Sequence, residues 1–553
     1  MKKYISFFII LAVVSLLTAC FSPWTGDSSI TINLGRSTGR YYLSSEEDIE
    51  GFEYTITLRG PGGTITKQVK ESGPVTFQVV PGIWTVDVRA FGDNTCNNDE
   101  LRLMDPPVSF QNRDRILRAL AIDANVEVKA GVNKPVYPRM ISAIEVYNAE
   151  ELYFAKNIAN YFGGEEIIVF SAETKEIVIE KTMDIFNIDT SDPIKIDLTI
   201  ISDGDLVLKR SPEKVAGDLL FPGSFFGISD NTSLTLGMPG MAGTITLDGG
   251  WDKEAPEPHE ITAPLISVNG IGFSENAATL VINEDVNLVK NNSGSGGGVY
   301  VNEGTFIMNG GAISGNKANA GGGVYVSHDT FNTSYSVGTF TMSGGVISGN
   351  QADEGGGVYI DRDTSGGYDE GGAFIMSGNA VISGNQVGEG GGGGVCIHRG
   401  IFNMSENTEI SENNAYNGGG VFVEEGDATM KGNAVIKNNT AYGTRGGGVC
   451  IYGVDNPASF EMLGGSIESN KCLLGDESGA TYGGGGVYSW GGTFHMSGGG
   501  ITKNRIPAGS HGAGVFAIHG GDNEVDESRI TGNFIDDAVA PNNEQFYLYN
   551  VLG

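Results

Sequence analysis

An asparagine recurs through the second half of the chain at an interval that few folds can accommodate. The repeated position is occupied by Asn292, Asn316, Asn350, Asn385, Asn413, Asn439, Asn470, Asn504 and Asn533. Most copies stand in a unit that begins Phe-x-Met, continues through a Gly-rich turn to Ile, and reaches Gly-Gly-Gly-Val after the Asn. The intervals run from 24 to 35 residues. Internal repeats of this length predict a solenoid or a propeller.

The number of short strands in each unit decides between a solenoid and a propeller. Each unit contains three short strand motifs, whereas a propeller blade needs four antiparallel strands. Three short strands and three turns make one coil of a parallel β-helix, and its hand should be right, as in nearly all parallel crossovers. The longer intervals contain insertions, such as residues 327–338, 361–372 and 473–482, which belong at the corners of coils.

The repeat also predicts which side chains face the interior. The middle residue of Phe-x-Met varies freely, for example between Ile307, Thr341 and Glu461, so it faces outward and the Phe and Met face inward. The glycine runs supply positive φ angles for turns. Asparagine amides stacked from coil to coil are expected to hydrogen-bond to one another and to cap buried backbone groups.

These motifs resemble those of the right-handed parallel β-helix (pectin-lyase-like) family. They are similar in particular to the repeats of polymorphic outer-membrane proteins, which carry Gly-Gly-Ala-Ile and Phe-x-x-Asn, as residues 310–313 and 306–309 do. The resemblance covers residues 142–545 at the level of the fold. It implies a solenoid that hosts polysaccharide lyases and glycoside hydrolases in other members. No membrane barrel is expected after these repeats, and a lipid anchor would replace it.

The first residues resemble a bacterial lipoprotein signal. Lys2 and Lys3 precede an apolar run over residues 4–17, which is too short for a permanent membrane span. Leu-Thr-Ala follows and leads to Cys20. The resemblance implies cleavage before Cys20 and attachment of lipid to its thiol, and several acyl chains anchor stably. An ordinary secretory peptide is the alternative. The absence of Asp after Cys20 suggests the outer membrane, if the cell has two.

The intervening chain is divided by composition and hydrophobic period. We expect a signal peptide over 1–19, a tether over 20–50, a β-sandwich over 51–138, a helical cap over 142–162 and a parallel β-helix over 163–545, with clear repeats over 292–533. Period-two alternation between Gly/Pro turns supports the sandwich, which is similar to immunoglobulin-like or transthyretin-like modules. We favour a spacer role for it over ligand binding. The expected fold class is all-β.

Charge and cysteine content exclude some partners. The formal net charge of −33 disfavours nucleic acid, and its simplest effect is solubility. No Cys-x-x-Cys pair occurs, so zinc is not expected. A weak calcium motif runs through Asp361, Asp363, Ser365, Gly366 and Asp369, but Gly372 replaces the final Glu. An exposed acidic loop is the preferred interpretation, so no cofactor is expected.

The search for catalytic residues yields only one weak constellation. Asp536 and Asp537 lie near His511 and His519 in the sequence, but their order is the reverse of that in hydrolases of this fold, and no Arg-x-Lys follows. We therefore expect no catalytic site. The sequence favours a cell-surface lipoprotein that acts as a non-enzymatic adhesion or interaction scaffold. The alternative is a polysaccharide lyase or glycoside hydrolase. Expected partners are the membrane through the anchor, and glycans or cell-surface proteins.

One column of side chains is a possible ligand face. In the Val-x-Val strands the outer residues should point inward, which leaves the middle residues outward: Tyr300, Tyr325, Tyr359, Cys396, Phe422, Cys450, Tyr488 and Phe516. An exposed aromatic ladder could stack on sugar rings or contact a protein. The preferred alternative is stacking between coils or cover by a corner loop. Cys396 and Cys450 should lie two coils apart, too far for a disulfide.

Overall fold

The chain forms two compact units, residues 1–145 and 146–553, which are described separately. The computed structural model describes residues 28–34, 52–70, 72–93, 113–185, 195–211, 214–215, 219–220, 223–241, 243–252, 263–270, 277–327, 337–361, 371–453, 457–473, 483–518, 523–536 and 538–549. The proposed lipid attachment site, Cys20, lies outside these ranges.

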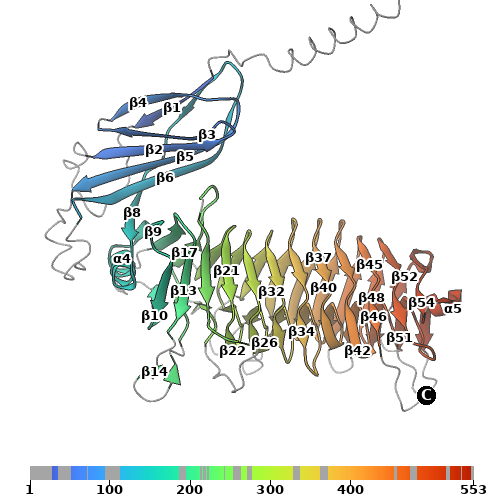
Figure 1. Ribbon diagram of the computed structural model, residues 1–553. Helices are drawn as coiled ribbons and strands as arrows, with labels where there is room; N and C mark the ends of the chain where they lie inside the picture. The colour runs from blue at the N-terminus through green and yellow to red at the C-terminus, as the bar shows by residue number, and fades with distance from the viewer. Residues whose placement is uncertain are drawn as a thin grey trace, which may run out of the picture. The chain divides into compact units, whose positions relative to one another are not determined.

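The N-terminal unit is a two-layered β-structure (Figure 1). In one sheet β1 (Ser29–Leu34) lies between β4 (Gly73–Gln78), antiparallel to it, and β7 (Asn133–Val136), parallel to it. The other sheet has the antiparallel order β3-β2-β5-β6-β8. Its strands are β2 (Glu53–Gly60), β3 (Gly63–Val69), β5 (Gly82–Asp93), β6 (Arg115–Val128) and β8 (Ile141–Val146).

Both sheets contribute to one apolar core. Ile30 and Ile32 of β1 are fully buried in the same cluster as Ile56 and Trp84 of the second sheet. The indole of Trp84 donates a hydrogen bond to the Val80 carbonyl at 2.9 Å, which satisfies its buried N–H. Residues 29–34 were predicted to lie in a tether, and this was wrong because they form β1. Only three apolar residues alternate in this segment, and polar segments flank it, so its hydrophobic period was too short to indicate a strand.

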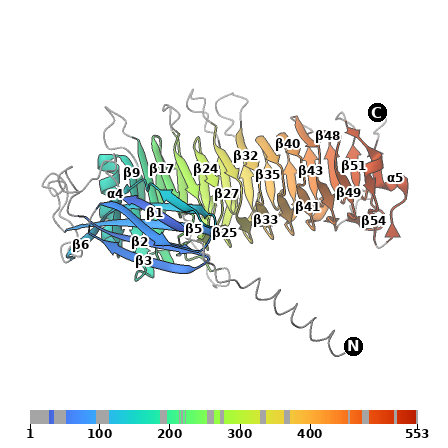
Figure 2. The same ribbon diagram turned by 90° about the horizontal axis from the view of Figure 1, so that it is seen from above.

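The C-terminal unit is a parallel β-helix, with twelve coils in its described residues (Figures 1 and 2), which confirms the predicted fold class. Sheet 1 contains β9 (Gly164–Phe170), β12 (Ile196–Ser202), β17 (Thr232–Leu236), β20 (Thr279–Ile282), β24 (Thr305–Met308), β28 (Thr339–Met342), β32 (Gly372–Met376), β36 (Gly400–Met404), β40 (Gly426–Met430), β44 (Ala458–Met462), β48 (Thr493–Met496) and β52 (Glu524–Val525). Sheet 2 contains β10 (Glu176–Ile179), β13 (Leu206–Arg210), β18 (Ile245–Asp248), β21 (Val286–Val289), β25 (Ala312–Ser314), β29 (Val346–Ser348), β33 (Val381–Ser383), β37 (Glu409–Ser411), β41 (Val435–Lys437), β45 (Ser466–Glu468), β49 (Gly500–Thr502) and β53 (Ile530–Thr531).

Two further sheets complete the coils. Sheet 3 contains β22 (Asn292–Ser295), β26 (Lys317–Ala320), β30 (Gln351–Ala352), β34 (Gln386–Val387), β38 (Asn414–Asn417), β42 (Thr440–Arg445), β46 (Lys471–Cys472), β50 (Arg505–Ile506), β54 (Phe534–Ile535) and β55 (Ala538–Val539). Sheet 4 contains β11 (Met183–Ile185), β16 (Phe226–Ser229), β19 (Ile266–Asn269), β23 (Val299–Asn302), β27 (Val324–Ser327), β31 (Val358–Ile360), β35 (Val395–Ile397), β39 (Val421–Val423), β43 (Val449–Tyr452), β47 (Val487–Trp490), β51 (Val515–Ile518) and β56 (Phe546–Tyr549). A small hairpin, β14 (Lys214–Val215) and β15 (Leu219–Leu220), stands apart from the four sheets.

Sheet 3 was not predicted, because the sequence analysis assigned three strands to each coil. Its strands are short and largely polar, as in Lys317–Ala320, where only Ala318 is buried. Such a segment has too little alternation to indicate a strand by itself. It is held as a strand by its register with neighbouring coils, for example Lys317 opposite Asn292 and Gln351.

Helix α4 (Ala149–Phe162) lies at the start of the solenoid, where a cap was predicted. Asn148 caps its first turn by accepting a hydrogen bond from the Glu151 amide at 2.9 Å. Leu152 and Ala155 are fully buried on the face that contacts β9, β10 and β11. The helix therefore covers the first coil, although residues 142–146 of the predicted cap belong to β8 instead.

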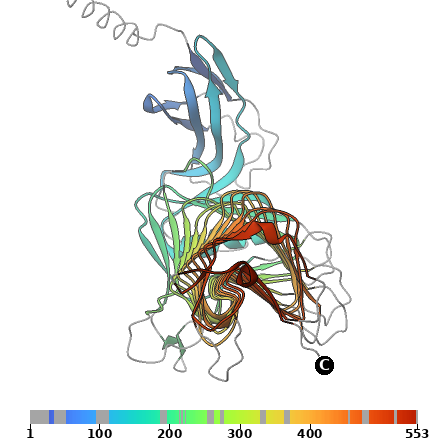
Figure 3. The ribbon, with the colours of Figure 1, turned by 90° about the vertical axis from the view of Figure 1, so that its right-hand side faces the viewer.

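The coils of the solenoid lie one behind another in the end-on view of Figure 3. Stacked identical side chains fill their interior. Phe306 stacks on Phe340 with ring centroids 4.5 Å apart, and Phe340 stacks on Phe374 at 4.6 Å. The methionines of the same motif are buried beside them, as predicted: Met308, Met342, Met376, Met404, Met430, Met462 and Met496. Ala428 interrupts the phenylalanine stack, and beyond it the rings of Phe460 and Phe494 are tilted by 45°.

An amide ladder runs between sheets 2 and 3. Its members are Asn291, Asn316, Asn350, Asn385, Asn413, Asn439, Asn470, Asn504 and Asn533, each with 0 % of its surface exposed. The sequence analysis named Asn292 as the first member, which was wrong by one residue. Asn292 instead begins β22, and it is Asn291 whose backbone N–H donates to the Asn316 side chain at 3.0 Å. Two adjacent asparagines made the alignment ambiguous.

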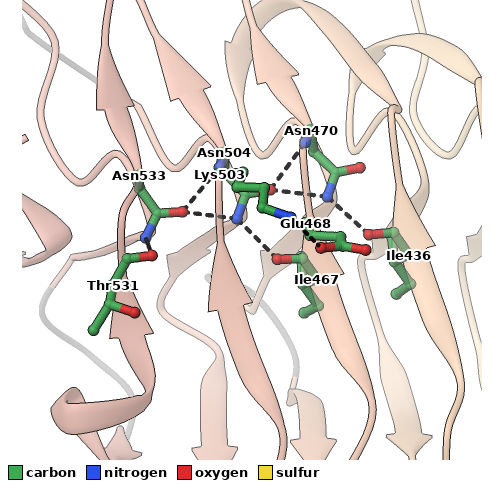
Figure 4. A network of polar contacts seen from close by, with 8 residues as sticks. All are labelled: Ile436, Ile467, Glu468, Asn470, Lys503, Asn504, Thr531 and Asn533. Atoms are coloured by element: carbon green, nitrogen blue, oxygen red, sulfur yellow. Dashed lines mark hydrogen bonds and ion pairs between the residues drawn. The ribbon is translucent and has the colours of Figure 1, made fainter. Parts of the chain in front are cut away.

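The ladder satisfies buried polar groups in a fixed pattern (Figure 4). Asn470 donates from its backbone N–H and its Nδ2 to the Oδ1 of Asn504, at 2.9 and 3.0 Å. The same Nδ2 also donates to the Ile436 carbonyl at 2.9 Å. Asn504 repeats this pattern toward Asn533 and Ile467. Only a side-chain amide can both donate twice and accept twice at one position, which explains the residue type.

Both ends of the ladder are capped. Gln545, in the short helix α5 (Asn542–Gln545), accepts from the backbone N–H and the Nδ2 of Asn533 at 3.0 and 2.8 Å. At the other end, the guanidinium of Arg210 donates to the Oδ1 of Asn291 at 3.2 Å. Because the side-chain carbonyls face the earlier coil throughout, a cation is favourable at that end, as it is at the C-terminus of a helix.

A left-handed corner precedes each ladder residue. Gly315 has φ +63° and Gly349 has φ +64°, whereas Glu412 and Lys503 adopt the same conformation at +59° without being glycine. A non-glycine residue there costs roughly 1 kcal/mol or more. Glycine is therefore a preference at this position rather than a requirement.

Replacing Asn413 by alanine should destabilise the full chain by about 3 kcal/mol or more, because each buried polar group left without a partner costs about 1–3 kcal/mol. The substitution removes the shared acceptor of the Asn385 backbone and side chain, and two donated bonds to Ile382 and Asn439. Urea unfolding measures the loss. Asn403→Ala, on the outer face of β36, is the control and should change stability by less than about 0.5 kcal/mol. Equal effects would contradict the role of the ladder.

Candidate functional site

The column proposed as a ligand face lies on the outside of sheet 4. Val299 and Val301 are fully buried on either side of Tyr300, and the same alternation places Tyr325 between two buried valines. Strand register aligns Tyr300, Tyr325 and Tyr359. The predicted outward direction of the column is therefore correct.

The exposed aromatic ladder, which was the less favoured interpretation, is absent from most of the column as described. Tyr300, Tyr325 and Phe422 are half-buried, but Tyr359 has only 6 % of its surface exposed, Tyr488 0 % and Phe516 2 %. The guanidinium of Arg445 lies 5.8 Å from the ring centroid of Tyr488 and 4.7 Å from that of Trp490. Side chains on the outer face therefore form their own apolar cluster, which also includes Cys450 and Ile518.

Stacking within the column limits what it can bind. The ring centroids of Tyr300 and Tyr325 are 5.4 Å apart and those of Tyr325 and Tyr359 5.3 Å, with nearly parallel rings. Tyr488 and Phe516 stack at 5.5 Å in the same way. A ring that faces a neighbour on both sides offers only its edge to a ligand. Sugar stacking on these faces is therefore blocked inside the column, and stacking between coils is the better description.

The cysteines of the column are free thiols. Cys396 and Cys450 are separated in the column by Phe422, as the strand register predicts. Burial raises the pKa of the Cys396 thiol and that of the Cys450 thiol. Both are therefore small packing residues in this structure rather than reactive nucleophiles.

The described acidic and histidine residues considered for catalysis make structural contacts in the last coil. His511 Nδ1 lies 3.0 Å from the Glu544 carboxylate, and its ring stacks on Tyr547 with centroids 4.3 Å apart. The carboxylate of Asp536 accepts a hydrogen bond from the Ala508 amide at 3.0 Å. Asp537 and His519 lie outside the described residues. The described members thus fasten the C-terminal coil and do not converge on a shared point.

A cluster that the sequence analysis did not assemble stands beside the column. Asp361, His398 and Glu424 directly follow β31, β35 and β39, so they occupy the same place in three consecutive coils. His398 Nδ1 lies 2.8 Å from Asp361 Oδ1, and its Nε2 lies 3.6 Å from Glu424 Oε2. The hydroxyl of Tyr325 donates to the other Asp361 oxygen at 3.1 Å. This cluster is the candidate site.

The electrostatics of the cluster favour a retained proton. The hydrogen bond to Asp361 raises the pKa of His398, and burial opposes it. Burial raises the pKa of Glu424, and repulsion from Glu354 adds to this while His398 counteracts it. Beside the cluster, Arg399 pairs with Glu425 through its Nε. An acid and a base with shifted pKa values in one place are typical of functional sites, although structural ion-pair networks also produce them.

The sequence contained one signal for this cluster. In the sheet 4 strands that begin with Val, the residue three positions after that Val can be aligned across the coils, giving Asn302, Ser327, Asp361, His398, Glu424, Tyr452, Trp490 and Ile518. The spacings of Asp361, His398 and Glu424 are unequal because an insertion and a shorter coil separate them. Spacing alone therefore could not bring them together, and only the register does.

A second surface feature is apolar. Ile375 and Ile401 are 41 % and 48 % exposed on the outer face of sheet 1, on the paired strands β32 and β36. Single exposed apolar residues are common, but two on adjacent strands enlarge the apolar area of a flat face.

Within the residues that the structure describes, no group of three or more His, Cys, Asp or Glu side chains is placed to hold a metal ion. Of the weak calcium motif, Asp361 is engaged by His398 and Tyr325, and Asp363, Ser365, Gly366 and Asp369 lie outside the described ranges. In the described parts of the chain, no helix is both long and apolar enough to span a bilayer.

Comparison with known proteins yields no relative. No family model matches the chain, and neither a curated protein nor a solved structure matches it. The parallel β-helix architecture is therefore established by the strands and their register, and it does not bring an activity with it.

Replacing Tyr488 by alanine should destabilise the full chain by about 3–5 kcal/mol, because a large buried ring leaves a cavity between Cys450 and Phe516. Tyr300→Ala, at the half-buried end of the same column, should cost less than about 2 kcal/mol. Thermal unfolding of both variants measures the difference. If Tyr488→Ala left stability unchanged, the column would be a free surface, contrary to its burial.

Proposed function

We propose that the protein is a bacterial cell-surface lipoprotein that acts as a non-enzymatic adhesion or interaction scaffold. Support for export comes from the basic start, the apolar run and Cys20. Lipid on Cys20 anchors the chain, in the outer membrane where the cell has two. Its solenoid is of the pectin-lyase-like kind, and its repeats are similar to those of polymorphic outer-membrane proteins.

One observation carries the scaffold proposal. The repeated polar and aromatic side chains of the described coils are directed to contacts between coils, as in the amide ladder and the phenylalanine stack. They do not converge on a cleft with a distinctive chemistry. A solenoid stabilised in this way presents long, flat outer faces, which suit contact with extended partners.

The outer faces of sheets 1 and 4 are the proposed contact surfaces. On sheet 4 the half-buried Tyr325 donates a hydrogen bond to Asp361 of the cluster that Asp361 forms with His398 and Glu424. On sheet 1, Ile375 and Ile401 add apolar area. Glycans or cell-surface proteins are the proposed partners. The acidic net charge of −33 opposes binding to nucleic acid.

A polysaccharide lyase or glycoside hydrolase is the second candidate. For this function, the Asp361–His398–Glu424 cluster is a better candidate site than the Asp536–Asp537 pair, because its members lie close together and are partly exposed. The raised pKa of Glu424 would suit a general acid, and His398 or Asp361 would suit a general base. No cofactor is proposed for either function.

Cys20→Ala should abolish lipid attachment in a bacterial host while leaving the solenoid folded, because Cys20 supplies the thiol that carries the lipid. Incorporation of radiolabelled palmitate and the membrane fraction of the cell lysate measure this. Cys472→Ala is the matched control and should retain the label. Labelling of the Cys20→Ala protein would show that the anchor lies elsewhere.

Incubation of the full chain with a panel of acidic and neutral polysaccharides should release no chain ends above a heat-inactivated control, while one or more of them bind. Release assays and co-sedimentation measure the two outcomes. Release that is lost in Glu424→Gln but kept in Asp427→Asn, an exposed carboxylate on sheet 1, would replace the scaffold proposal with the enzyme. Neither release nor binding would leave proteins as the remaining partners.

A further inference from the structure

One imidazole connects three consecutive coils of the solenoid. His398 reaches back to Asp361 at 2.8 Å and forward to Glu424 at 3.6 Å, one contact from each ring nitrogen. Its side chain keeps 31 % of its surface exposed, and those of Asp361 and Glu424 keep 21 % and 39 %. The three residues are 37 and 26 positions apart in the chain, so only the stacking of coils brings them together.

Among the described residues, acidic and aromatic groups and one arginine surround the imidazole, and the charge of that arginine, Arg399, opposes protonation of His398. From its own coil, Arg399 is neutralised by Glu425 of the next coil. From the preceding coil, the Tyr359 ring stacks on His398 with centroids 6.4 Å apart, and Glu354 adds a further negative charge near Glu424. The protonated imidazole therefore contacts a carboxylate of the coil before it and one of the coil after it.

Protonation decides whether this contact is attractive on both sides. A doubly protonated imidazole donates from both ring nitrogens, so it attracts Asp361 and Glu424 together. A neutral imidazole has one donor. If Nδ1 keeps its proton for Asp361, then Nε2 presents a lone pair to the Glu424 carboxylate, and the two carboxylates repel each other across the ring.

We propose that His398 is a pH-sensitive clamp that fastens the coils of β31, β35 and β39 to one another when it is protonated and releases them when it is neutral. In a solenoid each coil contacts mainly its neighbours, so the release loosens these coils locally and leaves the rest in place. The clamp also sets the charge of the outer face of sheet 4, which becomes more negative by one unit when the proton leaves.

The direction of the pH dependence follows from linkage. The Asp361 hydrogen bond raises the pKa of His398 above its ordinary value of 6.5. The stabilisation is fully present below the ordinary pKa of a histidine in the unfolded chain, and it is lost as the pH rises through the higher pKa of the folded state. The coils should therefore be tightest in mildly acidic solution and loosen in mildly alkaline solution.

Two measurements on the full chain test the proposal. Nuclear magnetic resonance titration of histidine-labelled protein, with the His398 signal identified by its loss in His398→Gln, should give a pKa above 6.5 that falls in Asp361→Asn and in Glu424→Gln. Hydrogen–deuterium exchange, corrected for intrinsic rates, should show a ratio of wild-type to His398→Gln protection over β31, β35 and β39 that is about threefold greater at pH 6.0 than at pH 8.5, the size expected of a partly exposed ion pair.

His495→Gln is the control variant, because His495 makes a similar contact with Glu524 on the outer face of sheet 1. Its protection over the three strands should match that of the wild type at both pH values. A His398 pKa at or below 6.5, or the same protection ratio at both pH values, would overturn the clamp. Circular dichroism of His398→Gln confirms that any loss of protection is local.

Discussion

The buried amide ladder is the interaction on which the solenoid depends. A parallel β-helix must turn its chain sharply between strands, and each turn buries backbone groups that the strands cannot satisfy. The asparagines between sheets 2 and 3 solve this by accepting from one coil and donating to the carbonyl of another, all at 2.9–3.1 Å from Asn316 to Asn504. Each asparagine hydrogen-bonds to the asparagine of the next coil, so the register of each coil is fixed by the coils on both sides. The left-handed corners at Glu412 and Lys503 are tolerated in this arrangement.

A ladder of this kind is directional, so its two ends differ chemically. The end toward the first coils presents a side-chain carbonyl, and the Arg210 guanidinium meets it. Burial lowers the pKa of Arg210 to about 10, so it still carries its charge at neutral pH. The opposite end presents hydrogen-bond donors. The side-chain oxygen of Gln545 accepts from the Asn533 amide, and the side-chain nitrogen of Gln545 donates to the Ala540 carbonyl. Together with α4 over the first coil, these caps give the stack of coils a defined beginning and end.

Much of the solenoid could be predicted from the sequence because the repeat encodes it directly. The inward Phe and Met, the outward middle residue and the order of the strands follow from period-two alternation repeated in every coil. Sheet 3 could not be predicted, since Lys317–Ala320 has one buried side chain and is a strand only through its neighbours. The complete burial of Tyr488 could not be predicted, because it depends on Arg445, which comes from β42 of another sheet, and on how Trp490, two residues further along β47, packs. The Asp361–His398–Glu424 cluster needed the register across an insertion, which spacing does not give.

Residue-resolved hydrogen exchange of the ladder backbone tests the central claim most directly. The amide N–H of Asn385, Asn413, Asn439 and Asn470 each donates to a buried side-chain oxygen of the next coil. Full-chain exchange should place these amides among the slowest in the solenoid, opening only when neighbouring coils open together. If they exchange as fast as amides of the outer turns, the ladder does not hold the coils, and the phenylalanine and methionine stacks would have to account for the stability alone.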